Sequence, residues 1–581
     1  MKILLLTHAY NCLCQRLYVE SIQMGHNVSI EFDINDEVCL DAVNRFEPEL
    51  IIAPFLKRAI PEQIWQNILC WIVHPGIIGD RGPSSLDWAI LNQEKTWGVT
   101  ILQANEVMDG GDIWASASFP MRVSSKSSIY RQEVTSASIN AIKQALTNLE
   151  DKQFKAKPLS AYPLADNAKW RDVIKQSDRA ISWAIDDSET ILRKINSADG
   201  NPGLLTQLTN TELVNREFYL YNASIDHGLR GNPGSIIATK DKAIAIATID
   251  SAIWVSHLAE KVIHEDISFK KPLKLPATLV LGEACHKLAL QCSGSQSYKE
   301  VWHHIQTVTE SNSQYNIAYL YFNFYNGAMS TEQCNALLKE YNFLAASNVE
   351  AIILMGGNDF FSNGIHLNTI ESSESPSDAS WQNINAMNDI CQAIINTTDK
   401  LTVAAINGNA GAGGVFLALT CDLVAANDEV VLNPHYKSMG NLFGSEYWTY
   451  TLPERVGKEQ ALEVMNNRLP LNATQAREMS LIDFTFAKEQ FLAELINTVK
   501  NIINNKEFNS YISTKVNKRL QDEKAKPLSE YREEELKQMK LNFYGFDPSY
   551  HVARYHFVNK LPKARTPSYL AKHRRVDYRK D

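Results

Sequence analysis

A histidine and an aspartate occupy positions where an α/β sheet usually places catalytic groups. His74 ends the apolar run CWIVH and precedes a glycine-rich loop, and Asp109 lies in the later turn NEVMDGGDIW. On two neighbouring strand-end loops, an imidazole and a carboxylate can act as an electrophile and a general acid or base. Each residue is also common in a purely structural role, because a strand-end histidine is often hydrogen-bonded in place and D-G-G-D is a frequent turn.

Two glycine-rich turns in the second half of the chain could form an oxyanion hole. The stretches AIILMGGNDFFSNGIHL and AAINGNAGAGGVFLALTCDLVAA each predict a strand, a tight turn and a helix. Backbone N–H groups of two such turns can converge on one carbonyl oxygen, and glycine permits the close approach. A turn that only packs a helix is the alternative for the string GAGG.

The elements that would position these residues fall into two α/β patterns. Short apolar runs alternate with helical patterns from residue 1 to about residue 118, which indicates parallel βαβ units, and a similar alternation begins at Asn316. Between them, residues 213–265 predict a small β-domain, and residues 266–298 predict a linker with a short helix. Residues 505–545 have helical spacing, and the tail beyond Pro562 is basic.

The composition is typical of a globular protein with several domains. The chain has 581 residues, of which 45% are hydrophobic and 21% are charged, and this length suggests about three to five domains. A formal net charge of −9 and a pI near 5.9 argue against a nucleic-acid partner. The nine cysteines are scattered, which predicts reduced thiols and no metal site. With no signal peptide and no long apolar stretch, we expect a cytoplasmic protein without a membrane partner.

The motifs around His74 resemble those of the formyltransferase family, which includes methionyl-tRNA and glycinamide ribonucleotide formyltransferases. HPGIIGDRGPSSLDWAIL, followed by WGVTILQANEVMDGGDIW, matches the family's motifs at His74, Asp109, Gly111 and Ile113. The resemblance implies a Rossmann-like domain, 10-formyltetrahydrofolate as the formyl donor, and His74 and Asp109 as catalytic residues. It also implies a folate-binding role for Phe55, Leu56, Ile60, Gly82, Ser84 and Gly111.

One position departs from the pattern of that family. The family has an asparagine two residues before the histidine, where this chain has Ile72. The loss of such an oxyanion donor can cost about 3 kcal/mol of transition-state stabilisation. A thiol acceptor, which is a better nucleophile than an amine of similar basicity, could tolerate the weaker oxyanion hole. A transferase fold that is kept only as a scaffold is the alternative.

The glycine-rich turns resemble those of the enoyl-CoA hydratase/isomerase (crotonase) family over about residues 300–500. The resemblance implies a ββα-spiral domain that binds coenzyme A. By position, the N–H groups of Ile365 and Gly413 would form the oxyanion hole, and Gly364 would belong to the binding turn.

The two glutamates of the hydratases are missing from this chain. Their positions fall at Phe416 and His435, so the resemblance excludes a standard hydratase. Tyr436 and Glu446, in the segment NPHYKSMGNLFGSEYW, remain as candidate acid and base. Ordinary placement in the core or at the surface is the alternative for both.

The order of a formyl-folate module and a crotonase module resembles a family of hydrogenase maturation factors. The resemblance implies formyl transfer from 10-formyltetrahydrofolate to CoA, and then decarbonylation of formyl-CoA to the CO ligand of [NiFe]-hydrogenase iron. Partners would be [NiFe]-hydrogenase maturation proteins and small-molecule substrates. The expected α/β domains are 1–160 (formyltransferase-like), 161–270 (connecting helix and small OB-like β-domain), 271–300 (linker), 301–505 (crotonase-like) and 506–581 (helical extension with a basic tail).

Three other functions are compatible with the residues. A formyltransferase that acts on an amine, or a formyl-folate hydrolase, would carry a vestigial crotonase domain. A non-enzymatic scaffold would bind CoA or folate and recruit assembly proteins. For CoA itself, Arg574 and Arg575 in the basic tail are candidate phosphate contacts, with a solvated tail as the alternative.

Overall fold

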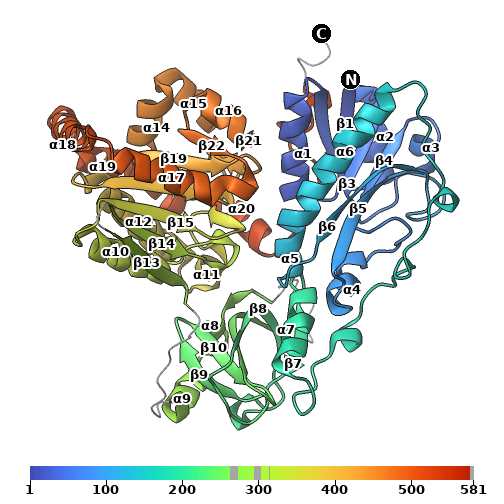
Figure 1. Ribbon diagram of the computed structural model, residues 1–581, viewed down its shortest axis with the longest axis horizontal. Helices are drawn as coiled ribbons and strands as arrows, with labels where there is room; N and C mark the ends of the chain where they lie inside the picture. The colour runs from blue at the N-terminus through green and yellow to red at the C-terminus, as the bar shows by residue number, and fades with distance from the viewer. Residues whose placement is uncertain (262–271, 293–302, 313–314, 576–581) are drawn as a thin grey trace. The chain divides into compact units, whose positions relative to one another are not determined.

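The computed structural model describes residues 1–261, 272–292, 303–312 and 315–575 and divides the chain into two compact units. The first unit comprises Met1–Trp302 together with Lys563–Asp581, and the second comprises His303–Pro562 (Figure 1). The predicted α/β fold is confirmed in both units. Parts of the predicted linker, small β-domain and basic tail lie outside the described residues.

A six-stranded sheet in the order β2-β1-β3-β4-β5-β6 forms the N-terminal part of the first unit. Successive strand residues point to opposite faces, so Leu4 and Leu6 pack with helices α2 and α3 in one core cluster. Helices α1 and α6 pack together on the other face (Figure 1). The elements are β1 (Lys2–Thr7), α1 (Cys12–Gln23), β2 (Asn27–Phe32), α2 (Asp36–Phe46), β3 (Leu50–Phe55), α3 (Glu62–Trp65), β4 (Cys70–His74), α4 (Ser85–Leu91), β5 (Thr96–Gln103), β6 (Ile113–Pro120), α5 (Lys126–Ile129) and α6 (Thr135–Glu150).

Only part of this sheet is parallel. Strands β1 to β4 run parallel, whereas β5 is antiparallel to β4 and β6 is antiparallel to β5. The prediction of parallel units up to residue 118 is therefore wrong for β5, which runs antiparallel to both of its neighbours. Residues 104–112 join β5 to β6 without a helix, and a parallel connection needs a crossover of about a dozen residues or more. This antiparallel loop carries Asp109.

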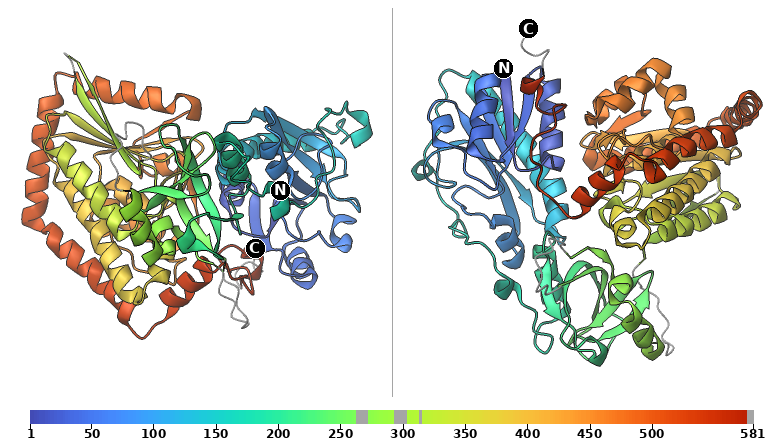
Figure 2. Two further views of the ribbon diagram at one scale, coloured as in Figure 1. Left: turned by 90° about the horizontal axis from the view of Figure 1, so that it is seen from below. Right: turned by 180° about the vertical axis from the view of Figure 1, so that it is seen from behind.

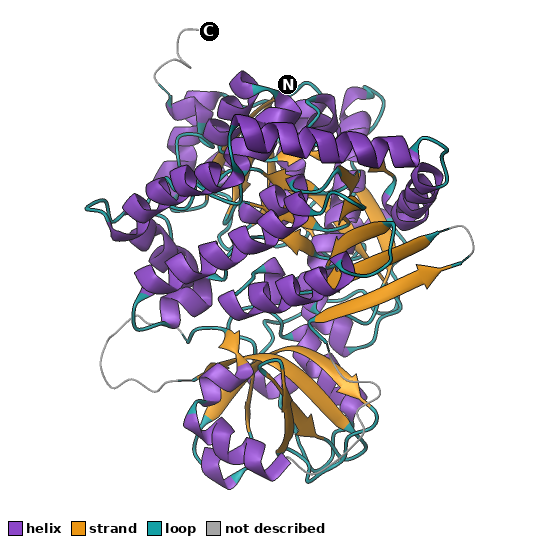
Figure 3. Ribbon diagram, turned by 90° about the vertical axis from the view of Figure 1, so that its left-hand side faces the viewer, coloured by secondary structure: helices purple, strands orange, loops and turns teal. Residues whose placement is uncertain are grey.

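The small β-domain of the first unit is an antiparallel sheet in the order β7-β8-β11-β10-β9, with β12 on β11 (Figure 3). The segment AIAIA forms β10, which is buried on both faces because Ile244 and Ile246 face one core cluster and Ala243 and Ala245 face another. The elements are α7 (Ser188–Ser197), β7 (Leu204–Gln207), β8 (Glu217–Asp226), β9 (Ile236–Lys240), β10 (Ala243–Ala247), β11 (Ala252–Glu260), β12 (Leu275–Pro276), α8 (Ala277–Leu281) and α9 (Glu283–Cys292).

The second unit contains a mostly parallel sheet in the order β13-β14-β15-β17-β19-β22 and a smaller sheet in the order β16-β18-β20-β21. The smaller sheet pairs the segments that follow three strands of the larger sheet. The segments after β15 and β17 contain the glycine-rich turns, and the segment after β19 leads to His435. The strands are β13 (Ile305–Ser311), β14 (Asn316–Phe322), β15 (Ala351–Gly356), β16 (Phe360–Ser362), β17 (Leu401–Ile406), β18 (Asn409–Gly411), β19 (Leu423–Asn427), β20 (Val431–Asn433), β21 (Leu471–Asn472) and β22 (Phe484–Phe486).

Helices complete the second unit. Residues 505–545 form two helices, which confirms the predicted helical spacing, and α19 packs on α12. Among the helices of the described residues, none is long and apolar enough to cross a bilayer. The helices are α10 (Thr331–Ala345), α11 (Leu367–Ser372), α12 (Pro376–Asn396), α13 (Gly413–Leu419), α14 (Trp448–Val456), α15 (Lys458–Asn467), α16 (Ala473–Glu478), α17 (Phe491–Ile503), α18 (Phe508–Ala525), α19 (Leu528–Tyr544) and α20 (Ser549–Val558).

The segment from residue 563 to residue 575 returns to the first unit and docks on the edge strand β2 (Figure 2). The Ile30 N–H donates to the Leu570 carbonyl, and the Phe32 N–H donates to Thr566 Oγ1. His573 lies between Ser29 and Glu31, with its Nε2 3.0 Å from Glu31 Oε2. The tail therefore covers a sheet edge that would otherwise present unpaired backbone groups.

Candidate active sites

His74 is buried at the end of β4, and its imidazole lies between two carboxylates. Nε2 is 3.4 Å from Asp80 Oδ2, and Nδ1 is 3.5 Å from Asp109 Oδ2. The predicted pair of His74 and Asp109 is thus brought together by the loops that follow β4 and β5. A carboxylate on each side of the ring can fix its orientation and stabilise a positive charge on it.

Asp109 is held by the glycine loop that follows His74. Its backbone is left-handed, with φ of 49°, and its Oδ2 accepts a hydrogen bond from the Gly82 N–H at 3.0 Å. A side chain at Gly82 would clash with the backbone carbonyl of Arg171, and one at Gly111 would clash with that of Gln103. These two glycines, which we predicted as folate contacts, therefore also have a packing role around Asp109.

Asp80 also belongs to this site, although we did not predict it from the sequence. Its Oδ1 accepts a hydrogen bond from Arg171 Nε at 2.7 Å, and its Oδ2 accepts one from Ser85 Oγ at 2.5 Å. The side chains of Asp80 and Arg171 are almost fully buried. Asp80 was visible in the motif HPGIIGDRG, but Arg171 lies far along the chain and has no local pattern that marks it.

We expect Asp80→Asn to lower the free energy of unfolding by about 3 kcal/mol, because it leaves the buried Arg171 guanidinium with only the more distant Glu94 carboxylate, 3.9 Å away, as a counter-charge. Urea unfolding followed by tryptophan fluorescence measures the change. Asp41→Asn is the matched control, since it breaks an exposed pair with Arg45 and should cost less than about 1 kcal/mol. Equal losses in the two variants would contradict this expectation.

An apolar core cluster adjoins His74 on the same side of the sheet. Ile72 is two residues before His74 on β4 and therefore faces the same side, where it packs with Leu56 and Ile60 in one cluster. The position of the family's asparagine is thus part of an apolar cluster, and its side chain offers no hydrogen-bond donor to an oxyanion. Phe55 is half-buried at the end of β3.

Ser84 precedes α4 and accepts a hydrogen bond from the Ile174 N–H at 3.1 Å. This contact ties the glycine loop to the segment that carries Arg171. We predicted Ser84 as a folate contact, and its hydroxyl has this protein partner.

In the second unit, the two glycine-rich turns meet. A side chain at Gly364 would lie 3.2 Å from the Gly413 nitrogen, and one at Gly414 would clash with the Ser362 carbonyl. Within the described residues, neither the Ile365 N–H nor the Gly413 N–H has a hydrogen-bond partner. Two unpartnered amides on adjoining turns are the arrangement that an oxyanion hole requires.

The Glu446 carboxylate lies directly against this pair of turns. A side chain at Gly413 would overlap Glu446 Oε1, so glycine leaves the space that the carboxylate fills. Glu446 Oε2 accepts a hydrogen bond from the Tyr436 hydroxyl at 2.5 Å. Burial raises the pKa of Glu446 to about 8, and the Tyr436 hydrogen bond opposes this rise while the neighbouring Glu535 adds to it. The predicted acid and base thus form a contacting pair.

Aromatic packing occupies the first hydratase position. Phe416 is fully buried and stacks on Tyr436, with 5.1 Å between the ring centroids and 17° between the planes. The stack holds the Tyr436 ring toward Glu446. His435, at the second hydratase position, is buried, and burial lowers its pKa to about 4. An imidazole of this kind is neutral at physiological pH.

Two residues that we did not predict hold the Glu446 backbone and its neighbour. The Glu446 N–H donates to Asn388 Oδ1 at 2.8 Å, and the neighbouring Ser445 contacts both Asn388 and Glu535. Asn388 lies on α12 and Glu535 on α19. Neither lies near Glu446 in the sequence, so no local pattern could have revealed them.

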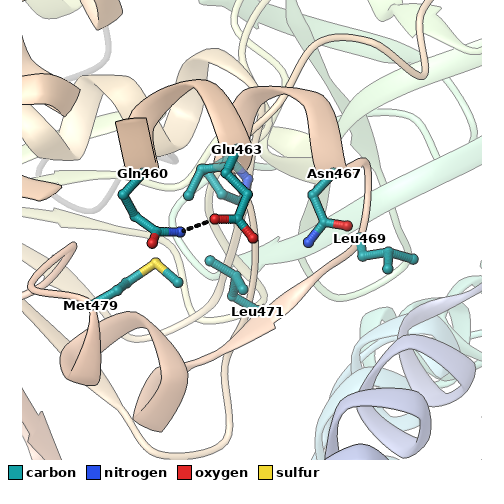
Figure 4. A pocket seen from close by; sticks show the side chains of 8 residues that line it. Gln460, Glu463, Asn467, Leu469, Leu471 and Met479 are labelled. Atoms are coloured by element: carbon teal, nitrogen blue, oxygen red, sulfur yellow. Dashed lines mark hydrogen bonds between the residues drawn. The ribbon is translucent and has the colours of Figure 1, made fainter. Parts of the chain in front are cut away.

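A hollow in the second unit includes Pro434, the neighbour of His435, in its lining. It is also lined by residues of α15, the following turn and β21, and by Met479, and within it Gln460 Nε2 donates to Glu463 Oε2 at 3.2 Å (Figure 4). Neither Tyr436 nor Glu446 is among its lining residues. The hollow is therefore separate from the predicted acid and base.

Family models match three stretches of the chain. The formyl transferase model matches residues 30–146, the formyl transferase C-terminal domain matches residues 173–265, and the enoyl-CoA hydratase/isomerase model matches residues 315–561. The predicted order of a formyltransferase module and a crotonase module is confirmed by these matches.

Individual relatives extend the similarity over the whole chain. The hydrogenase maturation factor HoxX of Bradyrhizobium diazoefficiens is 45% identical over 575 residues, which cover 99% of this chain and 97% of that protein. The crystal structure of HypX from Aquifex aeolicus in complex with tetrahydrofolic acid is 46% identical, covers 99% of each chain and superposes with a TM-score of 0.91. The methionyl-tRNA formyltransferase of Syntrophus aciditrophicus is 24% identical and matches 37% of this chain and 66% of its own length.

Proposed function

The chain belongs to the family of the hydrogenase maturation factors HoxX and HypX, and from that premise we propose that it makes the CO ligand of a [NiFe]-hydrogenase. In this proposal the N-terminal site transfers formyl from 10-formyltetrahydrofolate to the thiol of CoA. The C-terminal site then decarbonylates formyl-CoA to CO and CoA. Both steps would occur in the cytoplasm, where hydrogenase maturation proteins would receive the CO.

The observation that carries the proposal is the Glu446–Tyr436 pair beside the amides of Ile365 and Gly413. A hydratase adds water with two glutamates, and aromatic Phe416 occupies one of those positions here. A buried base with a raised pKa, placed against an oxyanion hole, supports removal of a proton from an acyl group without the addition of water.

In the first step the thiolate sulfur of CoA attacks the formyl carbon of the folate donor. His74 polarises the formyl oxygen, and Asp109 holds His74 in position or passes the thiol's proton toward N10. The new bond is C–S, the broken bond is C–N10, and the electron pair of the broken bond stays on nitrogen with that proton. The apolar side chains of Leu56, Ile60 and Ile72 would contact the pterin ring of the donor. The related HypX of Aquifex aeolicus forms a complex with tetrahydrofolic acid, which supports a folate donor.

In the second step the formyl oxygen lies on the N–H groups of Ile365 and Gly413. Glu446 takes the formyl hydrogen as a proton, and the C–H electron pair becomes the carbon lone pair of CO. The C–S bond breaks, its electrons stay on sulfur, and the thiolate recovers the proton from Glu446. The Tyr436 hydroxyl lies 3.1 Å from the Ser445 carbonyl, so it can donate there while Glu446 is protonated.

The proposal is tested with a formyl donor that carries carbon-13 in its formyl group. Incubation with CoA should release labelled CO, which a haem reporter and mass spectrometry detect, and release should stop when CoA is omitted. Labelled formate without CO would indicate a formyl-folate hydrolase. Consumption of the donor only with an added amine would indicate an amine formyltransferase. If the formyl donor is not consumed under any of these conditions, the result would favour the non-enzymatic scaffold.

A further inference from the structure

The loop that carries Glu446 has a strained backbone. Glu446 and Tyr447 are consecutive residues in the left-handed region, with φ of 61° and 57°. Residues with a β-carbon rarely adopt this conformation, and it persists where surrounding contacts determine it. The direction of the Glu446 side chain depends on this backbone, so the groups that hold the loop also aim the carboxylate.

One carboxylate makes four of the contacts that hold the loop. Glu535, on α19, is fully buried and accepts hydrogen bonds on both of its oxygens. Its Oε1 accepts from the Thr449 N–H at 2.8 Å and from the Thr449 hydroxyl at 2.6 Å. Its Oε2 accepts from the Tyr447 N–H at 3.0 Å and from Ser445 Oγ at 3.3 Å. The first N–H groups of a helix have no hydrogen-bond partner within that helix. Glu535, on α19, therefore accepts the hydrogen bonds of two such backbone amides at the start of α14.

We propose that Glu535 is a positioning residue of the second site, because it holds the left-handed loop that sets Glu446 against Gly413 and its negative charge makes Glu446 a stronger base. This inference rests on the proposed function of Glu446 and assigns a catalytic purpose to α19. Asn388 completes the support, since its Oδ1 accepts from the Glu446 N–H.

Burial raises the pKa of Glu535 to about 7, and the hydrogen bonds from its partners oppose this rise and favour the ionised form. All four groups that contact it are donors, and a protonated carboxyl would turn one of its oxygens into a competing donor. Two carboxyl groups close together disfavour each other's ionisation, and the charge of Glu535 accordingly helps to raise the pKa of Glu446.

The other titratable groups that face Glu446 are neutral. They come from three elements packed around it: Tyr436 from the preceding loop, Cys391 from α12 and Cys334 from α10. Burial raises the pKa of the tyrosine hydroxyl and of both thiols well above their ordinary values. Among the described residues that act on Glu446, Glu535 is thus the neighbour that carries a charge, and it does so above its own pKa of about 7.

Glu535→Gln tests the inference through the pH profile of CO release from added formyl-CoA. In the unaltered protein the rate should rise with pH through about 8, because Glu446 must be ionised to accept a proton. The variant keeps the side-chain shape but loses the charge, so its midpoint should fall by about one pH unit and its kcat at least about tenfold. Glu533→Gln removes the same charge from the exposed side of α19 and should change neither value.

Glu535→Asp provides a second variant that retains the charge. Because its shorter side chain cannot reach all four donors, we expect a lower kcat, an unchanged KM and the midpoint of the unaltered protein. A lower kcat in Glu535→Gln with no change in midpoint would assign Glu535 a structural role alone and overturn the inference. A normal kcat in the Glu535→Asp variant would also overturn it, because the contacts would then not position Glu446.

An infrared titration separates this inference from the proposed function. The C=O band of protonated Glu446 is identified by its loss in Glu446→Gln and followed with pH. If the protein makes no CO, the proposed decarbonylation fails, but a lower titration midpoint in Glu535→Gln still supports the coupling between the two carboxylates. An unchanged midpoint in that titration overturns the coupling whether or not CO is made.

Discussion

Glu446→Gln is expected to stop the release of CO while the first site continues to load CoA, so that formyl-CoA accumulates. Glutamine keeps the size of the side chain but cannot accept the formyl proton, and a general base contributes about 10²–10⁴ in rate. CO is measured with a haem reporter, and the accumulated thioester is measured by mass spectrometry of the quenched reaction.

Tyr436→Phe should lower CO release less than Glu446→Gln does. The phenylalanine removes the hydroxyl that donates to Glu446 Oε2 but leaves the base and its stack on Phe416 in place. If the Glu446 variant releases CO at the normal rate, Glu446 is a structural residue and another group must accept the proton. His435 would then be the next candidate, since it is buried and neutral.

His74→Ala and Asp109→Ala are each expected to abolish consumption of the formyl donor, as measured by the absorbance change on loss of 10-formyltetrahydrofolate. Without His74 the formyl oxygen loses its electrophilic partner, and without Asp109 the ring loses the carboxylate 3.5 Å from Nδ1. The loss should be on the order of 10²-fold or more for each variant.

Added formyl-CoA is the control for these two variants. Both should convert it to CO at the normal rate, because the second site uses residues of the other unit. Circular dichroism should show an unchanged fold. Normal turnover of the formyl donor in either variant would remove His74 and Asp109 from the mechanism.

The parts of both sites that depend on local sequence were predictable. A strand that ends in a histidine, a glycine-rich turn and a turn that contains Asp109 each have a pattern within a few residues. The structure has His74 at the end of β4, Asp109 between β5 and β6, and Gly413 at the start of α13. The contact between Glu446 and Tyr436 also spans only a short segment of chain.

The supporting residues were not predictable in the same way. Asp80 meets Arg171 across 91 residues, and Glu535 meets Tyr447 across 88 residues. Such contacts follow from how helices and loops pack, and no periodicity in either segment indicates the partner. The direction of β5 was missed for a related reason, since short apolar runs look alike in parallel and antiparallel strands.

The docking of residues 563–575 on β2 has a consequence for the order in which the protein folds during synthesis. Phe32 and Thr566 are 534 residues apart, and at about 5–20 residues per second a ribosome needs roughly 30–100 s to make the intervening chain. Through that interval the nascent N-terminal sheet lacks the cover of its edge strand and the partners of Glu31. We expect the inserted second unit to be able to fold before the first is complete, with chaperones protecting the open edge meanwhile.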